Sequence, residues 1–157
     1  KVVFAATDFS DASLKATQHA AEVAQLANAE LHLLHVVDAG DFPEGEGSPL
    51  SPRSALEQKI TAEANKRLDA ARELISSRNL TIRTHLAWGT PWQQIVATAE
   101  SLSADLIVLG TIGRTGLQGL LVGNTAERVL DHSPCGVLTV KPDGYVSPVD
   151  PSSRPQS

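Results

Sequence analysis

The sequence predicts an α/β protein: an open, doubly wound sheet of five parallel strands with helices on both faces. Short apolar runs alternate along the chain with longer segments whose apolar residues recur at helical spacing. The chain has 157 residues, of which 41% are hydrophobic, so it can form one domain with its own core. No internal repeat divides it.

The first elements are a strand, a helix and a second strand. Val2 to Thr7 is an apolar run that ends at Asp8, which is typical of a strand buried on both faces. Residues 31–37 form the second such run, and residues 38–51, with three glycines and two prolines, predict a flexible connection. Ser10 is a candidate N-cap, and we expect the inner face of the intervening helix to carry Leu14, Ala20, Ala21, Ala24, Leu26 and Ala27.

The alternation continues to the end of the sheet. Thr90 followed by Pro91 indicates a helix start, with proline at the first helical position. We expect one domain over residues 1–142 and a disordered tail or linker over 143–157, which holds three prolines and four serines. The expected elements are a helix over 52–77, a strand over 80–87, a helix from 91 to about 103, a strand over 105–109, a helix over 125–132 and a strand over 136–140.

The connection between the fourth strand and the last helix carries the clearest chemical signal. Gly110 and Gly113 follow the strand, and Gly123 opens the helix. Glycines in such a connection let backbone N–H groups approach an anion, and the helix N-terminus adds a favourable dipole. Turn geometry alone also favours glycine in a long loop. A Walker loop needs Gly-Lys-Ser/Thr and a dinucleotide fingerprint needs a glycine at position 112, and this chain has neither.

The spacing Gly110-x2-Gly113-x9-Gly123-Asn-Thr resembles the nucleotide loop of the universal stress protein family, Gly-x2-Gly-x9-Gly followed by Ser or Thr. The resemblance extends to residues 6–10, 34–36 and 134–140, and so covers about residues 1–142. The glycine loop and the segment 141–145 look most like the second domain of the bacterial E-type tandem members. Asn124 departs from the family's Ser or Thr. We expect it to cap the last helix and to donate its amide NH2 to a phosphate oxygen.

The resemblance implies a stress-response sensor or regulator that binds ATP or AMP, with Mg²⁺ held through the phosphates. In sheets of this kind, ligands bind beyond the carboxyl ends of the strands, where Asp8, Val36 and Gly110 are expected. Local turn capping is the other role open to Asp8, and a solvated loop position is equally open to Arg114. The residues expected to bind the nucleotide are Ala6, Thr7, Asp8, Val36, Leu109, Gly110, Gly113, Arg114, Gly123, Asn124 and Thr125.

The sequence predicts a binding protein rather than an enzyme, and slow hydrolysis of the bound nucleotide is the only catalysis that it leaves open. A Gly-x-Ser-x-Gly elbow is absent, and the third strand ends without the aspartate of a phosphotransfer protein. His32 and His35 are expected on opposite faces of a strand, and no other pair has metal-ligand spacing. The alternative function is a nucleotide-free scaffold or an apolar-ligand-binding domain of a tandem E-type protein, which Asn124 leaves open.

Charge and composition limit the partners. The net charge of −5 gives no attraction for nucleic acid or an anionic membrane. A single cysteine, Cys135, and the lack of a secretory signal favour the cytoplasm. The resemblance implies a homodimer or an intramolecular domain pair through the last strand, residues 136–140, whose free edge would seek a partner. Since the chain begins inside an apolar strand and lacks methionine, we expect a fragment of a longer protein.

Overall fold

The computed structural model describes residues 1–38, 52–77, 79–111 and 123–144. Gly113, Arg114 and the predicted tail from residue 145 onward lie outside these ranges. Strands and helices alternate as predicted. Their bounds are β1 Val2–Ala6, α1 Asp11–Ala27, β2 Glu30–Val37, α2 Pro52–Ile75, β3 Ile82–Trp88, α3 Pro91–Ser101, β4 Leu106–Gly110, α4 Asn124–His132 and β5 Gly136–Val140.

The five strands form one parallel sheet in the order β3-β2-β1-β4-β5. The chain builds the sheet outward from β1 through β2 to β3, then returns to place β4 on the other side of β1. The strand order therefore reverses between β1 and β4, which is the point where open α/β sheets bind their ligands. The predicted fold class is confirmed.

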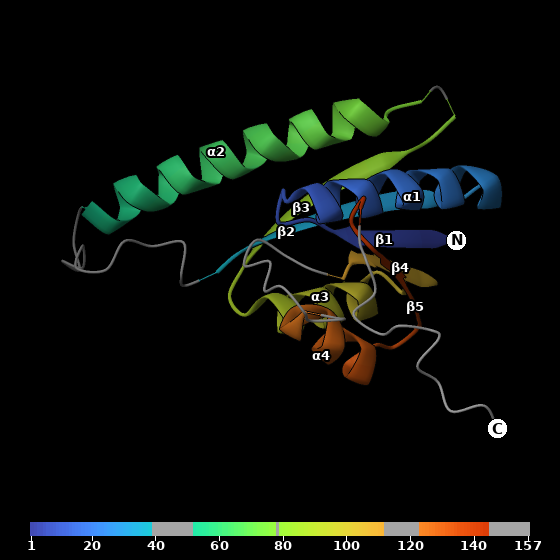
Figure 1. The fold of residues 1–157 in the computed structure, drawn as a ribbon. Coiled ribbons are helices and arrows are strands. Elements are labelled where there is room, and N and C mark those ends of the chain that lie inside the picture. Colours follow the sequence, from blue (N-terminus) through green and yellow to red (C-terminus); the bar gives the residue numbers. More distant parts are fainter. Residues whose placement is uncertain (39–51, 78, 112–122, 145–157) are drawn as a thin grey trace.

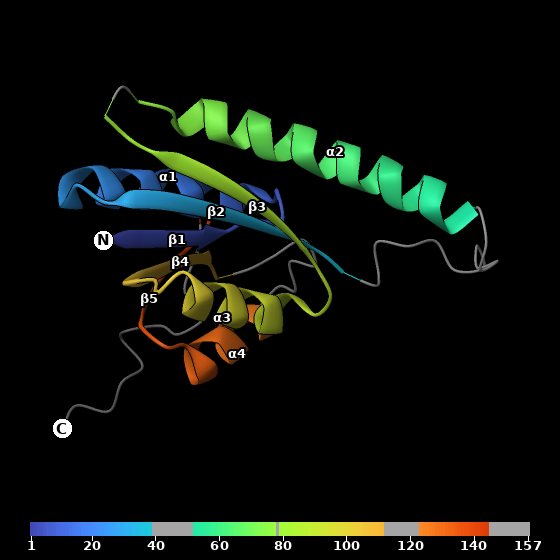
Figure 2. The ribbon, with the colours of Figure 1, turned by 180° about the vertical axis from the view of Figure 1, so that it is seen from behind.

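Two layers of helices cover the sheet. Helices α1 and α2 lie on one face, and α3 and α4 lie on the other (Figures 1 and 2). Side chains along β1 alternate between the two layers: Val3 and Ala5 join the core beneath α1 and α2, while Phe4 joins the core beneath α3 and α4. β1 is thus buried on both faces, in agreement with its continuous apolar sequence.

Helix α1 is held close to the sheet by small residues. Ala16, Ala20 and Ala24 are fully buried at four-residue spacing. The Ser10 hydroxyl accepts a hydrogen bond from the Ser13 N–H at 3.3 Å, which confirms the predicted cap. Leu26, however, is 89% exposed, so its expected place on the inner face is wrong. It lies two residues after Ala24, and residues two apart on a helix face different directions.

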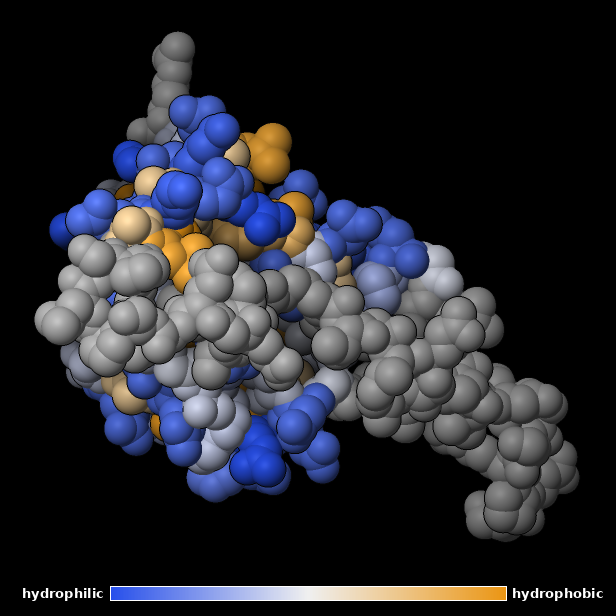
Figure 3. All heavy atoms as spheres, turned by 90° about the vertical axis from the view of Figure 1, so that its left-hand side faces the viewer, coloured by the Kyte–Doolittle hydropathy of each residue, from blue (hydrophilic) through white to orange (hydrophobic). Residues whose placement is uncertain are grey.

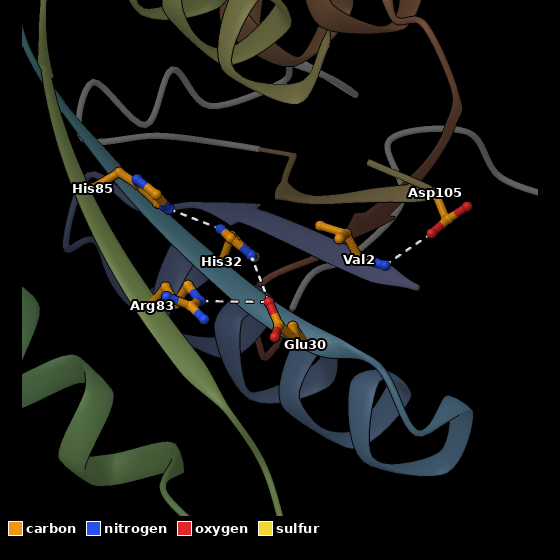
Figure 4. Close-up of polar contacts among 6 residues, drawn as sticks. All are labelled: Val2, Glu30, His32, Arg83, His85 and Asp105. Carbon is orange, nitrogen blue, oxygen red and sulfur yellow. Dashed lines mark hydrogen bonds and ion pairs between the residues drawn. The ribbon is translucent and has the colours of Figure 1, made fainter. Parts of the chain in front are cut away.

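Asp105 attaches the start of β4 to the start of β1. Its carboxylate accepts a hydrogen bond from the Val2 N–H at 2.8 Å (Figure 4). Its own N–H donates to the Val2 carbonyl at 2.9 Å. The two strands that border the point of reversal are therefore aligned from their first residues.

Candidate functional site

A cavity of about 260 Å³ opens at the point of reversal, beside the carboxyl ends of β1 and β4. Figure 3 shows the molecule from the side toward which the strands end, and on this face hydrophobic residues (orange) are visible between hydrophilic ones (blue). The lining residues come from the ends of strands β1, β2 and β4 and from helices α1, α3 and α4. They are Ala6, Thr7, Asp8, Ser13, Val36, Asp38, Pro91, Ile95, Leu109, Gly110, Thr111, Gly123, Asn124, Thr125 and Ala126.

The structure brings together every predicted site residue that it describes. Gly113 and Arg114 lie outside the described residues. The cavity lining also includes Ser13, Asp38 and Ile95, among others, which were not predicted from the sequence. Asp38 follows β2 as Asp8 follows β1, so the rule that selected Asp8 could also have found it. Ser13 and Ile95 lie within helices, and their place depends on packing that the sequence pattern does not specify.

Asp8 belongs to a tight turn between β1 and α1. Its Oδ1 accepts hydrogen bonds from the Ser10 N–H at 3.0 Å and from the Ser10 hydroxyl at 2.5 Å. The Phe9 N–H in turn donates to Thr7 Oγ1 at 3.0 Å. Both roles that the sequence left open for Asp8 are compatible with this geometry, because the residue closes the turn and also lines the cavity.

Buried hydroxyl groups form one wall of the cavity. Thr7 Oγ1 and Ser13 Oγ lie 3.0 Å apart, and the side chains are 4% and 6% exposed. The Ser13 hydroxyl also donates to the Ser10 carbonyl at 3.0 Å. On the backbone side, the Thr7 N–H donates to the Leu34 carbonyl at 2.8 Å. These bonds satisfy buried polar groups and fix the end of β1 against both α1 and β2.

Gly110 allows β4 to approach α1. A Cβ atom at this position would lie 3.0 Å from the Ala12 carbonyl carbon and 3.1 Å from the Ser13 nitrogen, both backbone atoms of α1. Further along, the Gly123 N–H donates to the Thr111 carbonyl at 2.5 Å. This bond joins the end of β4 to the start of α4, whatever path residues 112–122 take.

The prediction that Asn124 caps the last helix is wrong. The N-cap is Gly123, whose backbone is extended, with φ −71° and ψ 159°, and whose carbonyl accepts from the Glu127 N–H at 3.0 Å. Asn124 is the first helical residue, and its Oδ1 accepts from Arg128 Nε at 3.2 Å. Since arginine only donates, this bond leaves the amide NH2 as the polar group that Asn124 can offer to a ligand.

The first turn of α4 contributes Gly123, Asn124, Thr125 and Ala126 to the cavity lining. The first N–H groups of a helix have no partner within the helix, and they carry the positive end of its dipole. An anion in the cavity would therefore find donors on this side. The carboxylates of Asp8 and Asp38, which also line the cavity, offer acceptors.

A second polar cluster lies away from the cavity, on β2 and β3 (Figure 4). His32 Nδ1 and His85 Nε2 form a hydrogen bond of 2.8 Å, and Glu30 contacts His32 and Arg83 at 3.4 Å. Burial lowers the pKa of His85, and the charges of His32 and Arg83 lower it further. The hydrogen bond from His32 and the charge of Arg83 lower the pKa of Glu30. Sequence spacing missed this cluster because it forms across strands.

Within the described ranges, no group of three or more His, Cys, Asp or Glu side chains is arranged to hold a metal ion. No helix in the same ranges is long and apolar enough to cross a membrane.

The fold and the cavity define the class: an open, doubly wound α/β protein with a small cleft at the reversal of strand order, bordered by the N-terminus of a helix. The model of the universal stress protein family matches residues 1–141. The chain belongs to this family, which confirms the resemblance found in the sequence.

Relatives of known sequence support this family assignment. The universal stress protein MJ0531 of Methanocaldococcus jannaschii is 36% identical over 143 residues, which cover 90% of this chain and 82% of that protein. Universal stress protein E of Salmonella typhi is 51% identical over 67 residues, or 43% of this chain. That match spans only 21% of the E-type protein.

Solved structures also share the fold. Universal stress protein UspA from Lactobacillus plantarum superposes with a TM-score of 0.77 at 29% identity, covering 89% of this chain and 97% of that chain. A universal stress protein crystallised in complex with cAMP has a TM-score of 0.58 at 30% identity, covering 90% of this chain and 96% of that chain.

Proposed function

We propose that the cleft binds an adenine nucleotide, ATP or AMP, and that occupancy regulates the chain as a stress-response protein. The observation that carries this proposal is the placement of the α4 N-terminus and Asp8 around one cavity at the reversal of strand order. A helix N-terminus favours phosphate, and a carboxylate at a strand end can accept from a ribose hydroxyl or a base amine. The family member in complex with cAMP supports an adenine nucleotide as the ligand.

The two ends of the cleft suit different parts of the nucleotide. The first turn of α4, with Gly123, Asn124 and Thr125, would bind the phosphates. By the family spacing, Gly113 and Arg114 would join this group, and Mg²⁺ would be held through the phosphates. The nucleoside would lie against the ends of β1, β2 and β4, where the residues proposed to contact it are Ala6, Thr7, Asp8, Val36, Leu109 and Gly110.

The same proposal includes how the domain pairs with a partner and where it acts. β5 is an outermost strand, and Leu138 on it is 40% exposed, so its edge can pair with a second copy or with another domain of the same protein. We place the binding unit at residues 1–142 and its action in the cytoplasm, with residues 143–157 as a tail or linker.

Isothermal titration with ATP, AMP and GTP tests the ligand. We expect measurable heat with an adenine nucleotide at concentrations up to about 1 mM. Asp8→Asn is a suitable comparison because the amide oxygen can still accept from the Ser10 N–H while the charge is lost. We expect this variant to bind the nucleotide about tenfold more weakly with little change in stability. No heat from either adenine nucleotide would reject the proposal.

One observation favours the second candidate, an apolar-ligand-binding or scaffold domain. The inner walls of the cleft include Val36, Ile95 and Leu109, which are 7%, 3% and 4% exposed. Such a domain would give no nucleotide heat in the parent protein. Nucleotide binding that appears only in Asn124→Ser, which restores the family's residue, would support this candidate.

A further inference from the structure

The turn between β1 and α1 contains an aromatic residue with an unusual backbone conformation. Phe9 has a φ of +64°, in the left-handed region that bulky residues rarely adopt. The neighbouring bonds from Ser10 to Asp8 and from Phe9 to Thr7 span only two residues each. Such local bonds close a turn, but they do not require a positive φ at an aromatic residue. Such a conformation persists only where the surrounding structure holds it.

Side chains from β2 and α2 hold Phe9. The ring of His35, which is 6% exposed, lies with its centroid 4.4 Å from that of Phe9 at a tilt of 37°. The guanidinium carbon of Arg67, on α2, lies 4.4 Å from the Phe9 ring centroid, within the range of a cation–π contact. Phe9 is thus fixed by two elements that are distant from it in sequence.

His35 also holds the residue before Asp8. Its Nδ1 lies 2.8 Å from the Thr7 carbonyl oxygen. Because a carbonyl only accepts, Nδ1 carries the proton and donates. The imidazole therefore connects the backbone of Thr7 with the ring of Phe9, and these two residues flank Asp8.

We propose that Phe9, His35 and Arg67, here called the turn clamp, are positioning residues that hold Thr7 and Asp8 toward the cleft. None of the three lines the cavity, whereas both residues that they hold do. The effect of the clamp on ligand affinity rests on the proposed function, but its effect on the turn does not. Through the contact of Arg67 with Phe9, the clamp also links α2, which lies over β2 and β3, to the residues that line the site.

Arg67→Ala tests the clamp with little risk to the fold. Arg67 is exposed, and α2 packs on the sheet through the buried Ala64, Leu68 and Ala71. Arg72→Ala is the matched control, since Arg72 is an exposed arginine of the same helix and its loss changes the charge equally. Phe9→Leu removes the aromatic ring while it retains Arg67 and the full charge, so it separates the clamp from a direct attraction between Arg67 and phosphate.

The first measurement uses the protein without nucleotide. Hydrogen exchange of the peptide that contains residues 7–10 should quicken about two- to fivefold in Arg67→Ala and in Phe9→Leu, and should not change in Arg72→Ala. The free energy of unfolding, measured with urea, shows whether a variant destabilises the whole fold and not only this turn. Unchanged exchange in both clamp variants, or equal quickening throughout the protein, would overturn the proposal.

The second measurement titrates the same variants with ATP. Arg67→Ala and Phe9→Leu should both weaken binding by about two- to fivefold, Arg67→Lys should restore most of it, and Arg72→Ala should match the parent. A loss confined to Arg67→Ala would mean that Arg67 attracts phosphate directly and that the clamp does not set affinity. A parent protein that binds no nucleotide would contradict the proposed function, while the exchange measurement would still decide whether the clamp exists.

Discussion

At the scale of single residues, Asn124 shows why a plausible side chain need not take the expected role. It was predicted as a cap because Asn favours that position, but Gly123 takes the N-cap and Asn124 begins the helix. Its contact with Arg128 is an exposed pair four residues apart. We therefore expect Asn124→Ala to lower the free energy of unfolding by less than about 0.5 kcal/mol, as measured by urea denaturation.

The same substitution should affect ligand binding much more. If the Asn124 amide donates to a phosphate oxygen, Asn124→Ala should weaken ATP binding by about 1.5–3 kcal/mol, and Asn124→Ser should bind about as well as the parent. Titration calorimetry on the three proteins distinguishes these outcomes. Equal affinity of Asn124→Ala and the parent would remove Asn124 from the site.

The close packing of Gly110 against α1 leads to a prediction about stability. In Gly110→Ala, the new Cβ would press on the backbone of Ala12 and Ser13, so we expect a loss of about 1–3 kcal/mol in unfolding free energy. Gly136→Ala is the control, because the one contact that its Cβ would make with the described residues is with Leu106 Cδ1, at 3.7 Å. It should be neutral or slightly stabilising, since alanine restricts the unfolded chain. Equal losses of unfolding free energy in the two variants would show that the close approach of position 110 to α1 adds no destabilisation of its own.

At the scale of secondary-structure elements, α2 packs on the sheet through one stripe of buried residues. Leu68 is 1% exposed against the sheet, whereas Leu74 on the same helix is 72% exposed. Leu68→Ala should therefore cost about 2–5 kcal/mol of unfolding free energy. Leu74→Ala should cost less than about 0.5 kcal/mol. A large loss at Leu74 would indicate that this end of α2 is covered in solution.

The strands and helices also show which parts of the fold could be predicted from the sequence. Apolar runs and helical spacing predicted each described strand and helix within a few residues. The inner strands β1, β2 and β4 were the clearest, because burial on both faces of a parallel sheet requires a continuous apolar pattern. The same rules failed where neighbouring positions compete for one role, as at Gly123 and Asn124, and where the face of a helix had to be assigned, as at Leu26. The clamp on Phe9 could not be predicted, because it joins residues from three elements.

At the scale of the whole molecule, the cluster on β2 and β3 links stability to pH. The folded pKa of His85 is lowered from 6.5, so the unfolded chain takes up protons at this residue before the folded chain does. Stability should therefore fall as the pH drops through about 6.5 and should go on falling until the folded His85 is protonated. Glu30, whose pKa is also lowered, adds a separate loss at more acidic pH, below 4.5.

Urea unfolding at pH 7.5 and pH 5.5 measures the first of these effects. His85→Gln should lose less stability between the two pH values than the parent does, because glutamine does not titrate. His19→Gln is the control, since the His19 side chain lies on α1, outside the cluster, and is 44% exposed. A parent and a His85→Gln variant with the same pH dependence would show that His85 is protonated equally in the folded and unfolded states.

We propose above all that an adenine nucleotide occupies the cleft at the reversal of strand order. Titration of ¹⁵N-labelled protein with ATP, followed by amide chemical shifts, tests it most directly. We expect saturable shifts concentrated at residues 6–8, 36–38, 109–111 and 123–126, with the cluster of His32 and His85 unchanged. Shifts that are absent at millimolar ATP, or that gather away from these ranges, would contradict it.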